Sequence, residues 1–81
     1  MPVSFRLGMG QMLVKCGDME GNLDRARAMI RAGADAGCRM VVLPECLDLG
    51  WTFPGACQWA GPVPGRTTDA FCQAAIDACR Y

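Results

Sequence analysis

A short run of apolar residues, Met40–Leu43, constrains the fold of this chain more than any other feature of its sequence. Continuous apolar runs of this length are typical of parallel β-strands that are covered on both faces of a sheet. The run stops at Pro44, which cannot donate a ladder hydrogen bond, and Glu45 follows at once. We therefore predict a buried strand over 40–43, with a carboxylate just beyond its carboxyl end.

An alternating segment near the start of the chain has the period of a second strand. Phe5, Leu7 and Met9 alternate with Arg6 and with glycines, and the pattern ends near Gln11. The glycines allow another backbone to approach closely, which suits a strand that is packed on both faces.

The segment between these two strands has the pattern of an amphipathic helix. Asn22 is the expected N-cap, because its side-chain oxygen can accept a hydrogen bond from a free N–H of the first turn. Gly37 is the expected residue after the helix, in the left-handed conformation. A strand, a helix and a strand in this order make a right-handed βαβ unit. Small or apolar residues at helical spacing form one face and charged residues the other: Leu23, Ala26, Ile30 and Gly33 against Asp24, Arg27, Arg31 and Asp35.

The stretch from Cys46 to Arg66 is long for a connection and is rich in proline and glycine. Loops beyond about 12–15 residues are usually functional or disordered. A last helix is expected to start after Thr67 or Thr68, either of which can cap it with a hydroxyl. The expected order is therefore β-α-β-loop-α, an α/β unit. Aromatic side chains within the loop argue against disorder: Trp51, Phe53 and Trp59.

Composition and charge limit the functions open to this chain. It has 81 residues, with 8 basic and 8 acidic side chains, which suits one globular unit. Zero net charge argues against a nucleic-acid or membrane partner, since either would need a basic surface. The sequence shows no secretory signal and no apolar run approaching the ~20 residues that span a bilayer. We therefore expect a cytoplasmic protein.

Cysteine usage points to free thiols. The chain has 6 cysteines, but no CxxC pair and no histidine, so neither a zinc site nor a redox motif is expected. A disulfide scaffold would need a secretory context, which is missing. We expect the cysteines to be packed as small hydrophobic residues: Cys16, Cys38, Cys46, Cys57, Cys72 and Cys79.

These segments, taken in order, resemble the amino-terminal segment of the nitrilase superfamily of carbon–nitrogen hydrolases. The resemblance extends from about Phe5 to about Arg80. Its parts are the first strand, both ends of the helix, the strand that runs into Pro-Glu, a Gly-aromatic pair and a Pro-Gly pair: the strand end near Gln11, Asn22-Leu23, 32–38, 40–45, Leu49-Gly50-Trp51 and Pro64-Gly65.

The resemblance implies a four-layer αββα sandwich, of which this chain would be the start. Two parallel strands leave both sheet edges open, a liability that native proteins normally manage. The α/β alternation also leads us to expect a third strand after the last helix. Residues 1–81 are thus expected to be the amino-terminal portion of a single carbon–nitrogen hydrolase domain, incomplete in this chain. The resemblance further implies that the complete protein is a homo-oligomer.

The resemblance also implies a reaction. Members of the family use a Glu-Lys-Cys set on a small amide, nitrile or carbamoyl substrate, and no metal or organic cofactor is implied. Glu45 matches the family's glutamate, the general base. The family's lysine and cysteine lie far downstream and have no counterpart here, so the 81-residue chain alone is expected to be inactive. Lys15 and Cys46 are expected to be a solvated loop lysine and a packed thiol.

Other interpretations of the same residues stay open. Judged by position alone, Glu45 can equally be a solvated loop acid. Trp51 and Phe53 can line a substrate pocket, because their loop leaves the same strand end as Glu45. Alternatively, they are buried against the rest of the domain or a second subunit. A different class of function is a non-catalytic interaction module whose open sheet edges pair with a partner chain.

Overall fold

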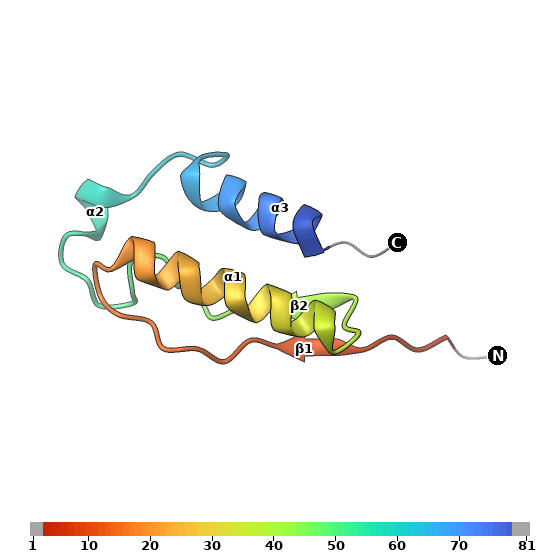
Figure 1. Cartoon of the computed structure of the whole chain (residues 1–81). Helices are drawn as coiled ribbons and strands as arrows, with labels where there is room; N and C mark the ends of the chain where they lie inside the picture. The colour runs from red at the N-terminus through yellow and green to blue at the C-terminus, as the bar shows by residue number, and fades with distance from the viewer. Residues whose placement is uncertain (1–2, 79–81) are drawn as a thin grey trace.

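A computed structural model describes residues 3–78 of the chain, which fold into two strands and three helices (Figure 1). The elements follow the order β1-α1-β2-α2-α3. Their bounds are β1 Leu7–Met9, α1 Met19–Asp35, β2 Met40–Val42, α2 Ala56–Trp59 and α3 Arg66–Ala78.

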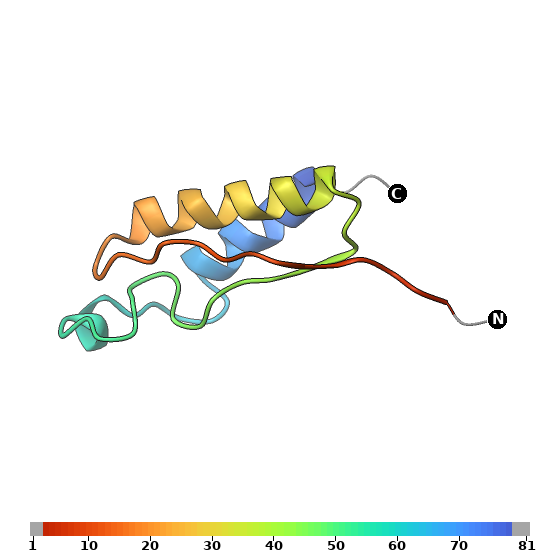
Figure 2. The ribbon, with the colours of Figure 1, turned by 90° about the horizontal axis from the view of Figure 1, so that it is seen from below.

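The two strands pair in parallel, and α1 connects them. Leu7 is in register with Met40, and the N–H of Gly10 donates to the carbonyl of Val42 at 2.8 Å, just past the end of β1. The predicted α/β class and the strand–helix–strand order are therefore confirmed. Figures 1 and 2 both place the long loop and α2 at the end of the molecule toward which the strands point.

Helix α1 starts earlier than predicted. Its N-cap is Asp18, whose side chain accepts a hydrogen bond from the N–H of Gly21 at 3.2 Å. The predicted N-cap at Asn22 is wrong, because Asp18 supplies the same kind of oxygen acceptor earlier in the chain. The predicted end is confirmed, since Gly37 follows the helix with φ 81°, a left-handed conformation that favours glycine.

A small core joins α1, the turn after β2 and α3. Leu23 and Ala26 of α1 are fully buried, and Leu47 from the turn completes the cluster. Phe71 of α3 packs against this cluster with the partly buried residues around it. Burial of side chains like these is the main favourable term in folding, at about 25 cal/mol per Å² of apolar surface. The apolar face of α1 therefore faces the core, as predicted.

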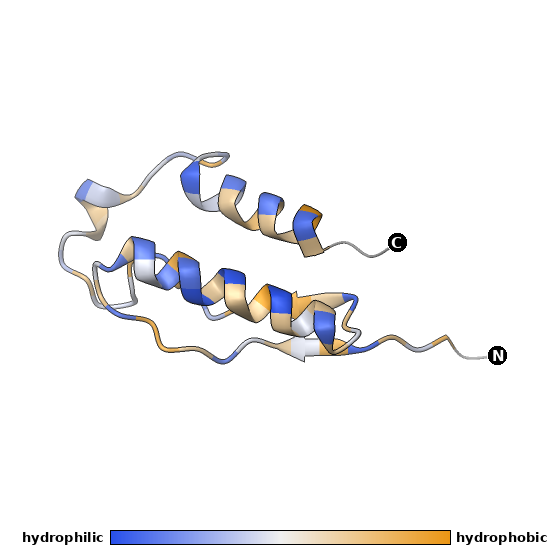
Figure 3. Cartoon of the chain, viewed as in Figure 1, coloured by the Kyte–Doolittle hydropathy of each residue, from blue (hydrophilic) through white to orange (hydrophobic). Residues whose placement is uncertain are grey.

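The other face of the strand pair is uncovered among the described residues, so packing of the strands on both faces stays a prediction for a complete domain. The helices pack on one face only, where Val41 lies half-buried beneath α1. Figure 3 shows β2 as a hydrophobic strand, whereas hydrophilic and hydrophobic positions alternate along α1. The uncovered apolar face consists of side chains that are 50% to 73% exposed: Phe5, Leu7, Met9, Met40 and Val42.

The loop after β2 contains the short helix α2, which the expected element order lacks. Helix α3 begins at Arg66, so both predicted caps lie inside it. The hydroxyl of Thr68 accepts from the N–H of Gly65 at 2.7 Å and lies 3.0 Å from the carbonyl of the same residue. This hydroxyl therefore stabilises the start of α3 from a position within the first turn.

The cysteines of the described residues are free thiols, but they are less packed than predicted. Cys38 is half-buried, whereas four others are exposed because they lie in connecting segments, in α2 or on the uncovered side of α3: Cys16, Cys46, Cys57 and Cys72. Cys79 lies outside the described residues. Within 3–78, no helix combines the length and the apolar character that a bilayer span requires.

The close approach of α1 to β2 at Gly33 gives a stability prediction. A methyl group added at Gly33 would lie 2.4 Å from Cγ2 of Val41, a β-branched side chain with little freedom to rotate. Alanine gains about 1 kcal/mol of helix propensity over glycine, but overpacking costs about 1–3 kcal/mol. We expect Gly33→Ala to lower the free energy of unfolding by about 1 kcal/mol in urea titrations followed by circular dichroism.

Two further variants control this experiment. Gly61→Ala adds the same methyl group where no atom lies within 4 Å, so its free energy of unfolding should stay within about 0.5 kcal/mol of the parent. Combining Gly33→Ala with Val41→Ala removes the clash, and the double variant should lose less stability than the sum of the single losses. A Gly33→Ala chain more stable than the parent would refute the close approach.

Candidate functional site

Glu45 lies in a turn at the carboxyl ends of the strands. Strand β2 ends at Val42, Pro44 follows, and the turn occupies 45–49. The Glu45 side chain is exposed. This is the edge of an α/β sheet at which ligands bind, because rigid strands end there and the loops are free to vary. The position agrees with the sequence-based expectation, and the role of Glu45 stays a prediction.

The turn holds an unusual backbone next to Glu45. Cys46 has φ 53°, the one positive φ among the non-glycine residues of the described chain. The N–H of Gly50, which has φ 92°, donates to the carbonyl of Cys46 at 2.9 Å and closes the turn. A left-handed non-glycine residue costs about 1–3 kcal/mol, and such residues cluster at functional sites. The backbone directly after Glu45 is therefore in a strained conformation, which the surrounding contacts must stabilise.

Asp48 anchors the turn to α3. Its Oδ1 accepts from the N–H of Leu49 at 2.9 Å, and its Oδ2 accepts from the hydroxyl of Thr67 at 3.1 Å. Leu47 and Leu49, on either side of Asp48, are buried in the core. The turn is thus held by apolar side chains and by a carboxylate that bonds to a neighbouring helix.

Asn22 is the buried polar centre of this region. It is fully buried, and its Nδ2 donates to the carbonyls of Lys15 at 2.8 Å and Asp48 at 2.9 Å. Its Oδ1 accepts from the N–H of Lys15 at 2.9 Å and from Nη2 of Arg25 at 2.5 Å. Both donors and both acceptor positions of the amide are used. One side chain therefore joins α1, the connection after β1 and the turn after β2.

Arg25 extends this network along α1. Its Nη2 lies 3.3 Å from the carboxylate of Asp18, and its Nε donates to the carbonyl of Leu13 at 2.8 Å. The role of Asn22 was not predicted, although the sequence carries a signal for it. An amide beside Leu23 and Ala26, on the apolar face of a predicted helix, needs buried partners.

The two loop aromatics, Trp51 and Phe53, differ in how far they are buried. Trp51 is 74% exposed, whereas Phe53 is partly buried. The Phe53 ring lies against the backbone at Gly17 and Gly55, where an added Cβ would lie 2.9 Å and 2.8 Å from ring atoms. Phe53 therefore packs within the chain, which agrees with the alternative of burial for this residue. A role for either aromatic in a substrate pocket stays a prediction.

The connection after β1 contacts the Glu45 turn directly. The N–H of Gly17 donates to the carbonyl of Leu49 at 2.8 Å, and an added Cβ at Gly50 would lie 3.0 Å from Cα of Cys16. The Lys15 side chain in this connection is exposed, as expected of a loop lysine. Backbone contacts between the two connections thus help to hold the turn, whereas the Lys15 side chain extends into solvent.

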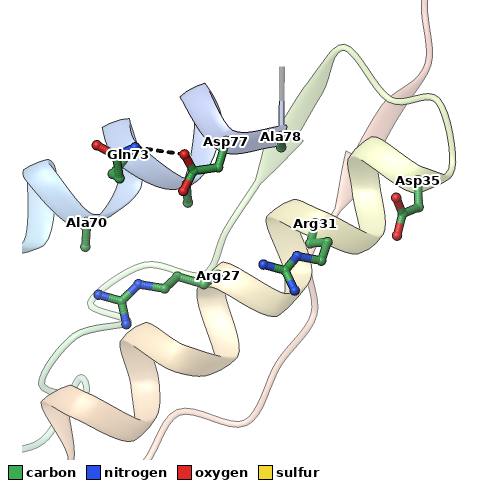
Figure 4. A pocket seen from close by; sticks show the side chains of 8 residues that line it. Arg27, Arg31, Asp35, Ala70, Gln73, Asp77 and Ala78 are labelled. Carbon is green, nitrogen blue, oxygen red and sulfur yellow. Dashed lines mark hydrogen bonds between the residues drawn. The ribbon is translucent and has the colours of Figure 1, made fainter. Parts of the chain in front are cut away.

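Two hollows lie apart from Glu45. One borders the turn at Asp48, between Trp59 and the start of α3 at Arg66. The other lies between α1 and α3 and is lined by Arg27 and Arg31 of α1 and by Gln73 and Asp77 of α3 (Figure 4). Neither is lined by Glu45, Trp51 or Phe53. Within residues 3–78, no three His, Cys, Asp or Glu side chains gather closely enough to hold a metal ion.

Comparison with known proteins identifies one family and several relatives. The family model described as carbon-nitrogen hydrolase matches residues 6–78. Omega-amidase NIT2 of Xenopus tropicalis is 35% identical to the chain over 77 residues, and Omega-amidase NIT2-B of Xenopus laevis is 32% identical over 77 residues. Each alignment covers 95% of this chain but 28% of the relative, so the chain spans less than a third of these proteins. No solved structure matches it at a significant level.

The separation of the two loop aromatics can be tested by truncation. Phe53→Ala removes a ring that is packed against backbone, so it should lower the free energy of unfolding by about 2 kcal/mol. Trp51→Ala removes an exposed ring and should change it by less than about 0.5 kcal/mol. Urea unfolding followed by circular dichroism measures both values. Equal losses for the two variants would contradict the packing described here.

Proposed function

The chain belongs to the carbon–nitrogen hydrolase family, and on this premise we propose that it supplies the general base, Glu45, to a hydrolase of non-peptide carbon–nitrogen bonds. The observation that carries the proposal is the place of Glu45. It is an exposed carboxylate directly after Pro44, at the carboxyl end of β2, within the residues that the family model matches. A general base must be reachable by substrate and nucleophile, and this position meets that requirement.

The proposed substrate is a small amide, with a nitrile or carbamoyl compound as a wider class. Two relatives are named as omega-amidases, which supports an amide for this chain. The proposed pocket includes Trp51, whose ring is exposed on the loop that leaves the same strand end. Phe53 would stabilise the conformation of that loop, because its ring packs against the backbone at Gly17 and Gly55.

The proposed reaction uses three catalytic groups: a glutamate, a lysine and a cysteine. Glu45 takes the proton of a cysteine thiol, and the thiolate attacks the carbonyl carbon to form a tetrahedral intermediate. A lysine stabilises the oxyanion, the protonated Glu45 gives its proton to the leaving amine, and a thioester remains. The Glu45 carboxylate then takes a proton from a water molecule as its oxygen attacks the thioester carbonyl. The carbon–sulfur bond breaks, the carboxylic acid leaves, and Glu45 returns the proton to the cysteine sulfur. Lys15 and Cys46 are not proposed for these roles, so the lysine and cysteine would come from chain beyond these 81 residues.

The proposed domain is a four-layer αββα sandwich, of which residues 1–81 form the amino-terminal portion. Helices α1 and α3 would form one outer layer, because α3 packs against α1 and α1 packs on one face of the strands. A second sheet would pack on the uncovered apolar face. Exposed apolar surface of this kind supports a partner layer in the complete domain.

The catalytic proposal predicts the effect of Glu45→Gln in the complete hydrolase. Glutamine keeps the shape but cannot take a proton, so turnover should fall by about 10²-fold to 10⁴-fold. The unfolding midpoint should not change, because the side chain is exposed. Release of ammonia from a small amide, measured beside a urea titration, separates the two effects. The matched control is Glu20→Gln, an exposed glutamate of α1 that pairs with Arg66, which should retain turnover.

Glu45→Gln with near-normal turnover would remove the assigned role. In that case the second candidate function, a non-catalytic interaction module, takes its place. The uncovered apolar face and the open edges of a two-stranded sheet favour it.

The interaction module predicts that the isolated chain associates as its concentration rises. Sedimentation velocity should show larger species at high concentration. Met9→Lys and Met40→Lys place charges on the uncovered face and should reduce this association. Asp24→Lys, on the exposed side of α1, is the control and should leave it unchanged. A folded chain that stays a monomer at every concentration argues against the module.

A further inference from the structure

The position of Glu45 is not set by the sheet. Strand β2 ends at Val42, and the intervening Pro44 has no N–H to donate. Among residues 3–78, the Glu45 carboxylate has no hydrogen-bond or ion-pair partner. Its position therefore depends on what holds the turn that follows it.

Contacts from two helices meet at Asp48 in that turn. Asn22 of α1 donates to the Asp48 carbonyl at 2.9 Å, and Thr67 of α3 donates to the Asp48 carboxylate at 3.1 Å. The same carboxylate accepts from the N–H of Leu49 at 2.9 Å. Asp48 is thus fixed through its backbone by one helix and through its side chain by another.

The choice of residue at Asn22 is costly for the helix. Asparagine is a weaker helix former than leucine by a few tenths of a kcal/mol, and a buried amide without partners would cost about 1–3 kcal/mol. Leucine has better helix propensity and would fill similar space beside Leu23 and Ala26, but it would leave the main-chain groups of Lys15 and Asp48 unpaired. Only an amide of this length supplies both donors and both acceptors, because aspartate has no donor and glutamine is longer. Departures from local preference of this kind are expected at functional sites.

We propose that Asn22 and Thr67 are positioning residues, which hold the Glu45 turn through Asp48 so that the carboxylate can act on the nucleophile. The inference rests on the proposed role of Glu45 and adds two residues that do not touch the substrate. A shift of about 1 Å in a catalytic group can cost about 10²-fold in rate. Because Asn22 and Thr67 act on the base and not on substrate binding, their loss lowers kcat and leaves KM nearly unchanged.

The test uses Asn22→Asp and Thr67→Val in the complete hydrolase. Asn22→Asp keeps the size and the acceptors but loses both donors, including the bond to Asp48. Thr67→Val keeps the shape and loses the hydroxyl. Each variant should lower kcat by about 10-fold to 100-fold with KM within about twofold of the parent. Asp24→Asn, on the exposed side of α1, is the control and should leave both constants unchanged.

Hydrogen exchange in the 81-residue chain tests the same contacts without catalysis. The amides of Gly17 and Gly50 bond to the carbonyls of Leu49 and Cys46, so they report on the turn. In Asn22→Asp they should exchange about tenfold faster, because the turn opens locally. The amides of Ala36 and Cys38 at the far end of α1 should keep their rates, which distinguishes local opening from loss of the fold.

The outcomes separate this inference from the proposed function. Turnover that survives in Glu45→Gln overturns the function, whatever Asn22 does. Loss of turnover in Glu45→Gln, together with parental kcat in both Asn22→Asp and Thr67→Val, overturns the positioning role alone. If Asn22→Asp does not fold, Thr67→Val decides, and parental kcat in that variant is enough to reject the inference.

Discussion

The buried amide of Asn22 is the interaction on which the rest of this structure depends. Strands of three residues supply few ladder bonds, and they cannot by themselves fix the connections that leave them. Asn22 bonds to both main-chain groups of Lys15 and to the carbonyl of Asp48. Without the amide these groups would be left unpaired, at about 1–3 kcal/mol for each that stays buried. It therefore holds both connections against α1, and the Glu45 turn takes its place from that contact.

The apolar contacts are arranged around this polar centre and on one side of the sheet only. Leu23, Ala26 and Leu47 form the buried cluster, and α3 adds Phe71 at its border. The face of β1 and β2 that points away from the helices stays exposed. A sheet with one covered face leaves contiguous apolar surface exposed to solvent. This asymmetry supports the proposal that α1 and α3 form one outer layer of a four-layer domain.

At the candidate site, the position of Glu45 and the contacts that hold its turn come from different parts of the chain. Pro44 and Glu45 are adjacent in sequence, and their place after an apolar run was enough to predict an acid at the strand end. The left-handed Cys46, the Asp48 anchor to Thr67 and the packing of Phe53 on Gly17 were not predictable. Each depends on residues that are distant in sequence, so no local pattern encodes it.

The periodicity of the chain was sufficient to predict the strand–helix–strand order, the left-handed Gly37 and the loop position of Glu45. These features depend on hydrophobic period and backbone sterics, which act over a few residues. The partners of Asn22 and the uncovered sheet face were decided only by the tertiary structure. Asn22 is a good N-cap by local preference, but Asp18 takes that role, and the amide binds a carbonyl 26 residues away. Which groups form buried hydrogen bonds depends on which segments pack together. Burial of the apolar faces determines that packing.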